Sequence, residues 1–117
     1  MPPSFLQDHA QFPRHRREVL DMAIVGHAAN PMCADVVDVG IVVEDGVIID
    51  AAFAGKGCAL CIGSASLLCE YVRNKRREDV HLDEMPHLLG ETVGRMREGC
   101  VRVSVTAFER AILPFRR

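Results

Sequence analysis

The chain is 117 residues long and carries 14 Lys and Arg against 16 Asp and Glu, which gives a formal net charge of −2. This length fits one domain with its own hydrophobic core, and we expect residues 1–117 to form it. The charge argues against nucleic-acid binding, because neutralising phosphates requires a basic face. No stretch approaches the ~20 apolar residues that span a bilayer, and no signal-peptide pattern opens the chain, so we expect no membrane partner and a cytoplasmic location.

The first half of the chain predicts one helix followed by three strands. Residues 4–11 predict a short helix with Ser4 as its N-cap, ended by Phe12 and Pro13. Residues 19–25 predict a modest strand closed by Gly26. Apolar and polar residues then alternate at 37–43 and again at 47–53, which predicts two strands paired as an antiparallel hairpin.

The turn of this hairpin decides which side chains share a face. A two-residue loop of Asp45 and Gly46 would put Val43 opposite Ile48 and send the two apolar rows to opposite faces of the sheet. We therefore predict a three-residue loop over residues 44–46. In this loop Gly46 is left-handed and Val43 lies opposite Val47.

The second half of the chain is predicted to be helical. A helix is expected from Cys58 to about Asn74, with the small residues 63–66 packed tightly on the sheet. Pro86 suits the first turn of a further helix that ends at Gly99. Cys100 would then open the last helix, which Pro114 ends.

Three of the five cysteines could meet near the start of the helix at Cys58. A helix N-terminus favours a thiolate, which can bind metal or accept sulfur. Cys33 and Cys100 could converge there, together with Asp35. Three thiolates and one carboxylate suit Zn²⁺ or an iron–sulfur cluster with one oxygen ligand. Spacing alone leaves open the alternative that all three cysteines are small buried hydrophobes.

Several segments resemble the NifU-like (IscU/SufU) family of iron–sulfur cluster assembly scaffolds. They are Asn30-Pro31-x-Cys33-x-Asp35, Gly57-Cys58 followed by Ser64-Ala65-Ser66, and the cysteine at the last helix. At the start of the chain, Leu6-x-Asp8-His9 and Pro13-Arg14 resemble the family's Asp-His-Tyr-x-Asn-Pro-Arg segment. The cysteine separations, 25 positions from 33 to 58 and 42 from 58 to 100, resemble the branch without the insertion typical of zinc-bearing SufU proteins.

The resemblance implies an α+β fold, in which a three-stranded antiparallel sheet carries helices on one face. It implies that Cys33, Asp35, Cys58 and Cys100 cluster at one end as metal ligands. The protein would be a scaffold and not an enzyme: sulfur from a cysteine desulfurase would reach Cys100, Cys58 or Cys33. A transient [2Fe–2S] cluster would form and pass to apo iron–sulfur proteins, with Asp35 as the labile ligand. Zinc is expected on the same ligands in the protein as isolated.

Two other functions stay open beside the scaffold. A sulfurtransferase-type activator of a desulfurase would hold Zn²⁺ on the four ligands, and its displacement would let Cys33 or another thiol accept sulfur. A structural zinc domain would serve protein contacts only.

The sequence also departs from the family pattern. The family's Cys-Gly-Asp is here Cys33-Ala34-Asp35, and the residue before the third cysteine, often His or Lys in the family, is Gly99. The segment 96–99 replaces the Leu-Pro-Pro-Val-Lys stretch by which an Hsp70-type chaperone recognises one branch, so chaperone dependence is doubtful.

Cys61 is an addition to the family pattern. It lies one helical turn after Cys58 and completes a Cys-x-x-Cys motif. It could be a spare ligand or sulfur relay, or a small residue packed under the site. Cys69, two turns further, is predicted to be plain core.

Overall fold

The computed structural model describes residues 5–30, 34–80 and 95–112, and for 5–7 and 95–101 it describes the backbone path alone. The three strands form one antiparallel sheet in the order β1-β2-β3, which confirms the predicted α+β fold. In chain order the elements are α1 (Phe5–Gln11), β1 (Ile24–Asn30), β2 (Asp35–Glu44), β3 (Val47–Lys56), α2 (Ala59–Val72), a short 3₁₀ turn (Arg77–Asp79) and α4 (Arg95–Ile112).

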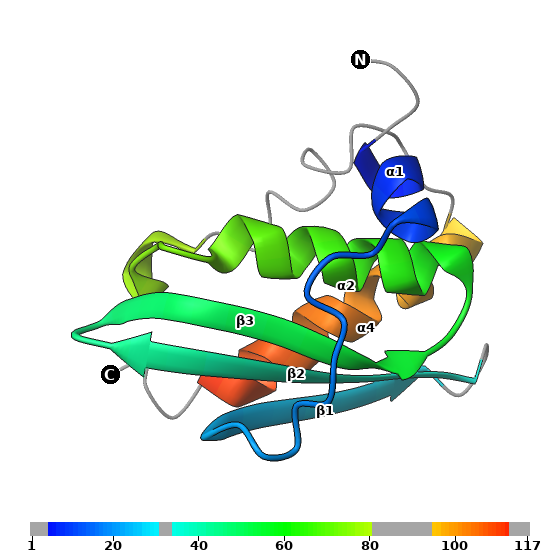
Figure 1. Cartoon of the computed structure of the whole chain (residues 1–117). Coiled ribbons are helices and arrows are strands. Elements are labelled where there is room, and N and C mark those ends of the chain that lie inside the picture. Colours follow the sequence, from blue (N-terminus) through cyan, green and yellow to red (C-terminus); the bar gives the residue numbers. More distant parts are fainter. Residues whose placement is uncertain (1–4, 31–33, 81–94, 113–117) are drawn as a thin grey trace.

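Two long helices cover one face of the sheet (Figure 1). Helix α2 packs on β3 and α4 packs on β1 and β2, while α1 lies against α2. Alternate residues of β2 and β3 meet the two helices in a single core. Its larger buried side chains are Val37, Val39, Ile41, Ile48, Phe53, Leu68, Val72 and Phe108. Within the described residues, no helix is both long and apolar enough to cross a membrane.

The opposite face of the sheet is partly covered by the segment that follows α1, which crosses the strands in Figure 1. Val19 is fully buried there. A Cβ on Gly40 would lie 2.5 Å from the Met22 sulfur and 2.9 Å from the Val19 Cβ. The predicted strand over 19–25 was therefore wrong in its bounds. Its first residues serve as a cover for the sheet, and the strand itself is Ile24–Asn30.

The hairpin turn also differs from the prediction. Asp45 and Gly46 have φ values of 54° and 79°, so both adopt the left-handed conformation of a two-residue turn. Glu44 pairs with Val47, and Val43 lies opposite Ile48. The predicted three-residue loop and the Val43–Val47 pairing were wrong.

A β-bulge restores the shared face that a two-residue turn would have lost. The register shifts between Val42 and Val43, so that Ile41 pairs with Ala51 and both are fully buried. Because β3 contributes the extra residue, Ile48 points into the core and Ile49 is 41% exposed. The bulge thus performs the register correction that the predicted three-residue loop would have provided.

The helices agree with the prediction at α1 and α2 but not at α4. Helix α4 is continuous through Gly99, so the expected helix end at Gly99 was wrong and Cys100 lies in the second turn. A glycine inside a helix costs about 1 kcal/mol relative to alanine, which packing can override. The predicted helix start at Pro86 lies outside the described residues, and α4 ends at Ile112, two residues before Pro114.

Candidate functional site

Asp35, the first residue of β2, is a fully buried carboxylate at the end of the sheet. Its Oδ1 accepts a hydrogen bond of 3.1 Å from the backbone N–H of Cys58. Its Oδ2 is also buried, and no described residue donates a hydrogen bond to it. Leaving a carboxylate oxygen buried and unpaired is costly, so this oxygen is a candidate ligand for a cation.

The absence of a side chain at Gly57 leaves space for the Asp35 carboxylate. A Cβ at this position would overlap Asp35 Oδ1 and would lie 3.1 Å from the Cβ of Cys61. The Gly57-Cys58 pair noted in the sequence therefore has a steric reason. Glycine lets the chain pass directly over Asp35 before helix α2 begins.

Ala34, which precedes Asp35 in the chain, has an unusual backbone conformation. Its φ is 56°, in the left-handed region where a Cβ is strained. This is the position at which the family pattern has glycine. The backbone here keeps the conformation that glycine adopts most readily, although the side chain has changed.

Cys58 is the N-cap of α2 and is exposed. Its backbone is extended, with φ −69° and ψ 169°, and its side chain makes no cap hydrogen bond. Its carbonyl accepts the N–H of Ile62 at 3.1 Å, which closes the first turn of the helix. The structure thus brings Asp35 and Cys58 together as predicted, with the thiol open to a partner or a metal.

The other two predicted ligands cannot be placed. Cys33 lies outside the described residues, and for Cys100 only the backbone in α4 is described. Within the described part of the chain, no group of three or more His, Cys, Asp or Glu side chains is arranged to hold a metal ion. The full set of Cys33, Asp35, Cys58 and Cys100 therefore stays a prediction.

Cys61 and Cys69 are both fully buried, but in different surroundings. Cys61 lies beside the candidate site, because a Cβ on Gly57 would lie close both to the Cys61 Cβ and to the Asp35 carboxylate. Cys69 belongs to the hydrophobic core, where burial raises the pKa of its thiol. Its predicted core role is confirmed.

A second polar cluster, which the sequence patterns did not predict, joins α1 to α2. His9 Nδ1 lies 2.7 Å from Ser66 Oγ, and the Arg14 backbone N–H donates to the same oxygen at 2.7 Å. Burial, and then the Arg14 cation, lower the pKa of His9. The signal was present in the quoted motifs, since His9, Arg14 and Ser66 belong to three of them.

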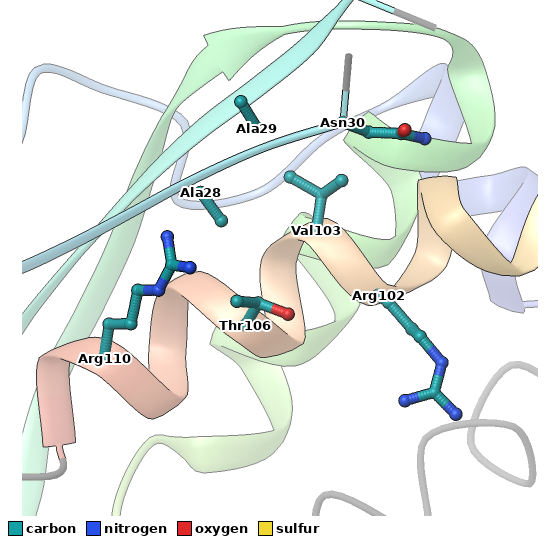
Figure 2. Close-up of a pocket in the computed structure, with 7 residues that line it drawn as sticks. All are labelled: Ala28, Ala29, Asn30, Arg102, Val103, Thr106 and Arg110. Carbon is teal, nitrogen blue, oxygen red and sulfur yellow. The ribbon is translucent and has the colours of Figure 1, made fainter. Parts of the chain in front are cut away.

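An open hollow of about 220 Å³ lies between the end of β1 and α4 (Figure 2). Arg110 reaches toward β1 and donates to the His27 carbonyl at 2.8 Å, whereas Arg102 points away from the strand. Among the described residues, the lining of the hollow includes Thr106 and Asn30 and holds no cysteine or carboxylate.

The chain matches the model described as NifU-like N terminal domain over residues 4–117. The chain belongs to the NifU-like family.

Curated relatives of this NifU-like chain include several iron–sulfur cluster assembly scaffold proteins named IscU. That of Thermotoga maritima is 34% identical over 73 residues, covering 62% of this chain and 51% of the relative. That of Haemophilus influenzae is 42% identical over 55 residues, covering 46% and 44%. The zinc-dependent sulfurtransferase SufU of Bacillus subtilis is 31% identical over 70 residues, covering 60% and 47%. The chain spans about half the length of the curated relatives it matches.

Solved structures share the NifU-like fold over almost the whole chain. A protein of Fervidobacterium islandicum AW-1, described as a candidate cluster assembly scaffold of the SUF system, aligns with a TM-score of 0.77 at 19% identity, covering 92% of this chain and 93% of that one. A NifU-like N-terminal domain from Brucella abortus aligns with a TM-score of 0.72 at 18% identity, covering 93% and 90%. At these identities the likeness establishes the fold alone.

Proposed function

We propose that the chain is a scaffold on which a [2Fe–2S] cluster is assembled, with Cys33, Asp35, Cys58 and Cys100 as ligands. The observation that carries the proposal is the fully buried Asp35 carboxylate, whose Oδ2 has no partner among the described residues. Its Oδ1 accepts a hydrogen bond from the backbone N–H of Cys58, whose thiol is exposed. Family membership and the names of the IscU relatives support the same function.

The donor set suits a cluster that must leave again. Thiolates are soft ligands that bind iron–sulfur clusters firmly, whereas a carboxylate is harder and binds less firmly. Asp35 is then the ligand at which exchange begins. The hydrogen bond from the Cys58 N–H to Oδ1 orients the carboxylate and leaves Oδ2 for iron, as the partners of metal ligands commonly do.

The sulfur would come from a cysteine desulfurase as persulfide. Transfer requires an accessible thiol, and Cys58 is exposed at the start of α2. Cys100 and Cys33 are the other candidate acceptors. The finished cluster would pass to apo iron–sulfur proteins.

A second candidate is a zinc-dependent sulfurtransferase that activates a desulfurase. The observation that favours it is the 31% identity with the Bacillus subtilis protein of that name. The thiolates that suit a cluster also suit tetrahedral zinc. In this function zinc would occupy the four ligands and be displaced when a thiol accepts sulfur.

Anaerobic reconstitution with a cysteine desulfurase, cysteine and ferrous iron separates the two functions. We expect a stoichiometric cluster, measured by visible absorption and by iron and sulfide content. The Cys58→Ser variant should lose it. Cys69→Ser is the matched control, because Cys69 is buried in the core away from the site, and it should keep the cluster. Zinc retained during sulfur transfer, with no cluster formed, would favour the sulfurtransferase.

A further inference from the structure

We propose that Cys61 is a resolving thiol, which attacks a persulfide on Cys58 and releases its outer sulfur as sulfide. The proposal rests on the proposed function in one respect, namely that Cys58 receives sulfur. Beyond that function, the proposal names the source of the electrons that reduce the transferred sulfur. A persulfide carries sulfur in the sulfane state, and a cluster contains sulfide, so two electrons must be supplied for each sulfur.

The two cysteines lie one helical turn apart at the start of α2. The hydrogen bond from the Ile62 N–H to the Cys58 carbonyl fixes that turn. Side chains three residues apart on a helix are neighbours, with Cβ atoms about 5–6 Å apart. A disulfide needs a Cβ separation of about 3.5–4.5 Å. A small adjustment of the extended N-cap residue, Cys58, would therefore bring the two sulfurs into bonding range.

The exposures of the two thiols set the order of events. Cys58 is exposed and Cys61 is fully buried. An external sulfur donor would therefore meet Cys58 first. Cys61 is shielded from solvent oxidants and would react with the neighbouring persulfide. This is the division of roles between an attacking and a resolving cysteine in Cys-x-x-Cys motifs.

Asp35 is the second observation that places Cys61 at the site. A Cβ on Gly57 would overlap Asp35 Oδ1 and approach the Cys61 Cβ at 3.1 Å, so carboxylate and thiol lie on the same side of Gly57. The buried Asp35 Oδ2, without a hydrogen-bond partner among the described residues, marks this position as one that receives a ligand. Cys61 therefore borders the position where the cluster would be built.

The step balances without an external reductant. The Cys61 sulfur attacks the inner sulfur of the Cys58 persulfide, and a bond forms between the two cysteine sulfurs. The bond from the inner to the outer sulfur breaks, and the outer sulfur leaves with that electron pair. It takes up the proton lost by the Cys61 thiol and departs as hydrogen sulfide. The two cysteines are oxidised to a disulfide while the sulfane sulfur is reduced to sulfide. An external dithiol must then reduce the disulfide before the next cycle.

The test uses the full chain, free of metal, under anaerobic conditions. The protein is treated with inorganic polysulfide carrying ³⁵S, desalted and alkylated, and its bound label and peptide masses are measured. Wild type should show a Cys58–Cys61 disulfide and almost no label on the peptide that contains Cys58. Cys61→Ala should hold the label as persulfide on Cys58, at least tenfold above wild type, until dithiothreitol releases it. Cys61→Ser serves as a second variant if the alanine variant folds poorly.

The matched control is Cys69→Ala, which removes a buried cysteine of the same helix away from the site. It should behave as wild type. Wild type that keeps a stable persulfide on Cys58 would overturn the resolving role and leave the scaffold function standing. Wild type with both thiols unmodified and no label would overturn the resolving role together with sulfur acceptance at Cys58.

Discussion

The geometry of the candidate site is set mainly by Asp35 and the residues next to it. The antiparallel pairing of β2 with β3 brings the start of one strand beside the end of the other, since Val36 pairs with Lys56. The alternation of apolar residues predicted this hairpin, so the proximity of Asp35 and Cys58 could be predicted from the sequence. The left-handed backbone of Ala34 could not, because alanine gives no signal for that conformation.

Ala34→Gly should stabilise the fold. Alanine in the left-handed region costs about 1–2 kcal/mol, and glycine recovers this while losing about 0.5–1 kcal/mol of chain entropy. We expect a net gain of roughly 0.5–1 kcal/mol in the free energy of unfolding, measured by urea denaturation.

The matched control for this change is Ala29→Gly. Ala29 is exposed within strand β1, where glycine costs entropy and gains nothing, so this variant should be less stable than wild type. Two variants shifted in the same direction would contradict the strain at Ala34.

Whole elements were harder to predict where small residues permit close packing. Strand β1 contains Gly26, Ala28 and Ala29, which give a weak strand signal, whereas the apolar residues before it gave a stronger one. The small residues are there because α4 packs against β1: a Cβ on Gly26 would overlap the Ala107 carbonyl. Local propensity also predicted a helix end at Gly99, but α4 continues through this residue.

Gly26→Ala should push α4 off the sheet. The obstacle is helix backbone, which cannot rotate away as a side chain can. We expect a loss of about 3 kcal/mol or more in the free energy of unfolding, at the upper end for overpacked sites. Urea denaturation would measure it. The matched control is Ala29→Val, which adds methyl groups at an exposed position of the same strand and should change the stability little. Similar losses in both variants would argue against the tight β1–α4 contact.

The docking of α1 on α2 should depend on pH through His9. Its pKa is lowered by burial and by Arg14, below the ordinary value of 6.5. Below pH 6.5 the unfolded chain therefore binds a proton that the folded chain does not. The His9 contribution to stability should be complete above pH 6.5 and fall as the pH drops toward the folded pKa.

Urea denaturation of wild type at pH 7.5 and pH 5.5 should show this loss, and His9→Gln, which cannot titrate, should show less of it. Glu70, whose pKa is lowered by its hydrogen bond to His15 from an ordinary value of 4.5, loses its contribution only at more acid pH. An identical pH dependence in wild type and His9→Gln would remove His9 from the account.

At the scale of the whole molecule, the fold presents one buried carboxylate and one exposed thiol at the same end of the sheet. Alternation predicted the hairpin of β2 and β3, and helical periodicity predicted α2. The three-stranded sheet and the full ligand set were implied by the resemblance of short motifs to a family. The structure describes the side chains of two of the four proposed ligands, Asp35 and Cys58. The proposed scaffold function therefore depends most on the role of Asp35.

The rate of cluster transfer to an apo-ferredoxin tests that role most directly. Wild type, Asp35→Ala and the control Asp38→Ala, which removes an acid of the same strand that pairs with His27, are loaded anaerobically to equal occupancy. In the proposed function Asp35 would bind iron least firmly and would be displaced first; without it, transfer would begin by displacing a thiolate. We predict that Asp35→Ala transfers the cluster several-fold more slowly, while Asp38→Ala keeps the wild-type rate. Transfer by Asp35→Ala as fast as by wild type would contradict the assignment of Asp35 as the release ligand.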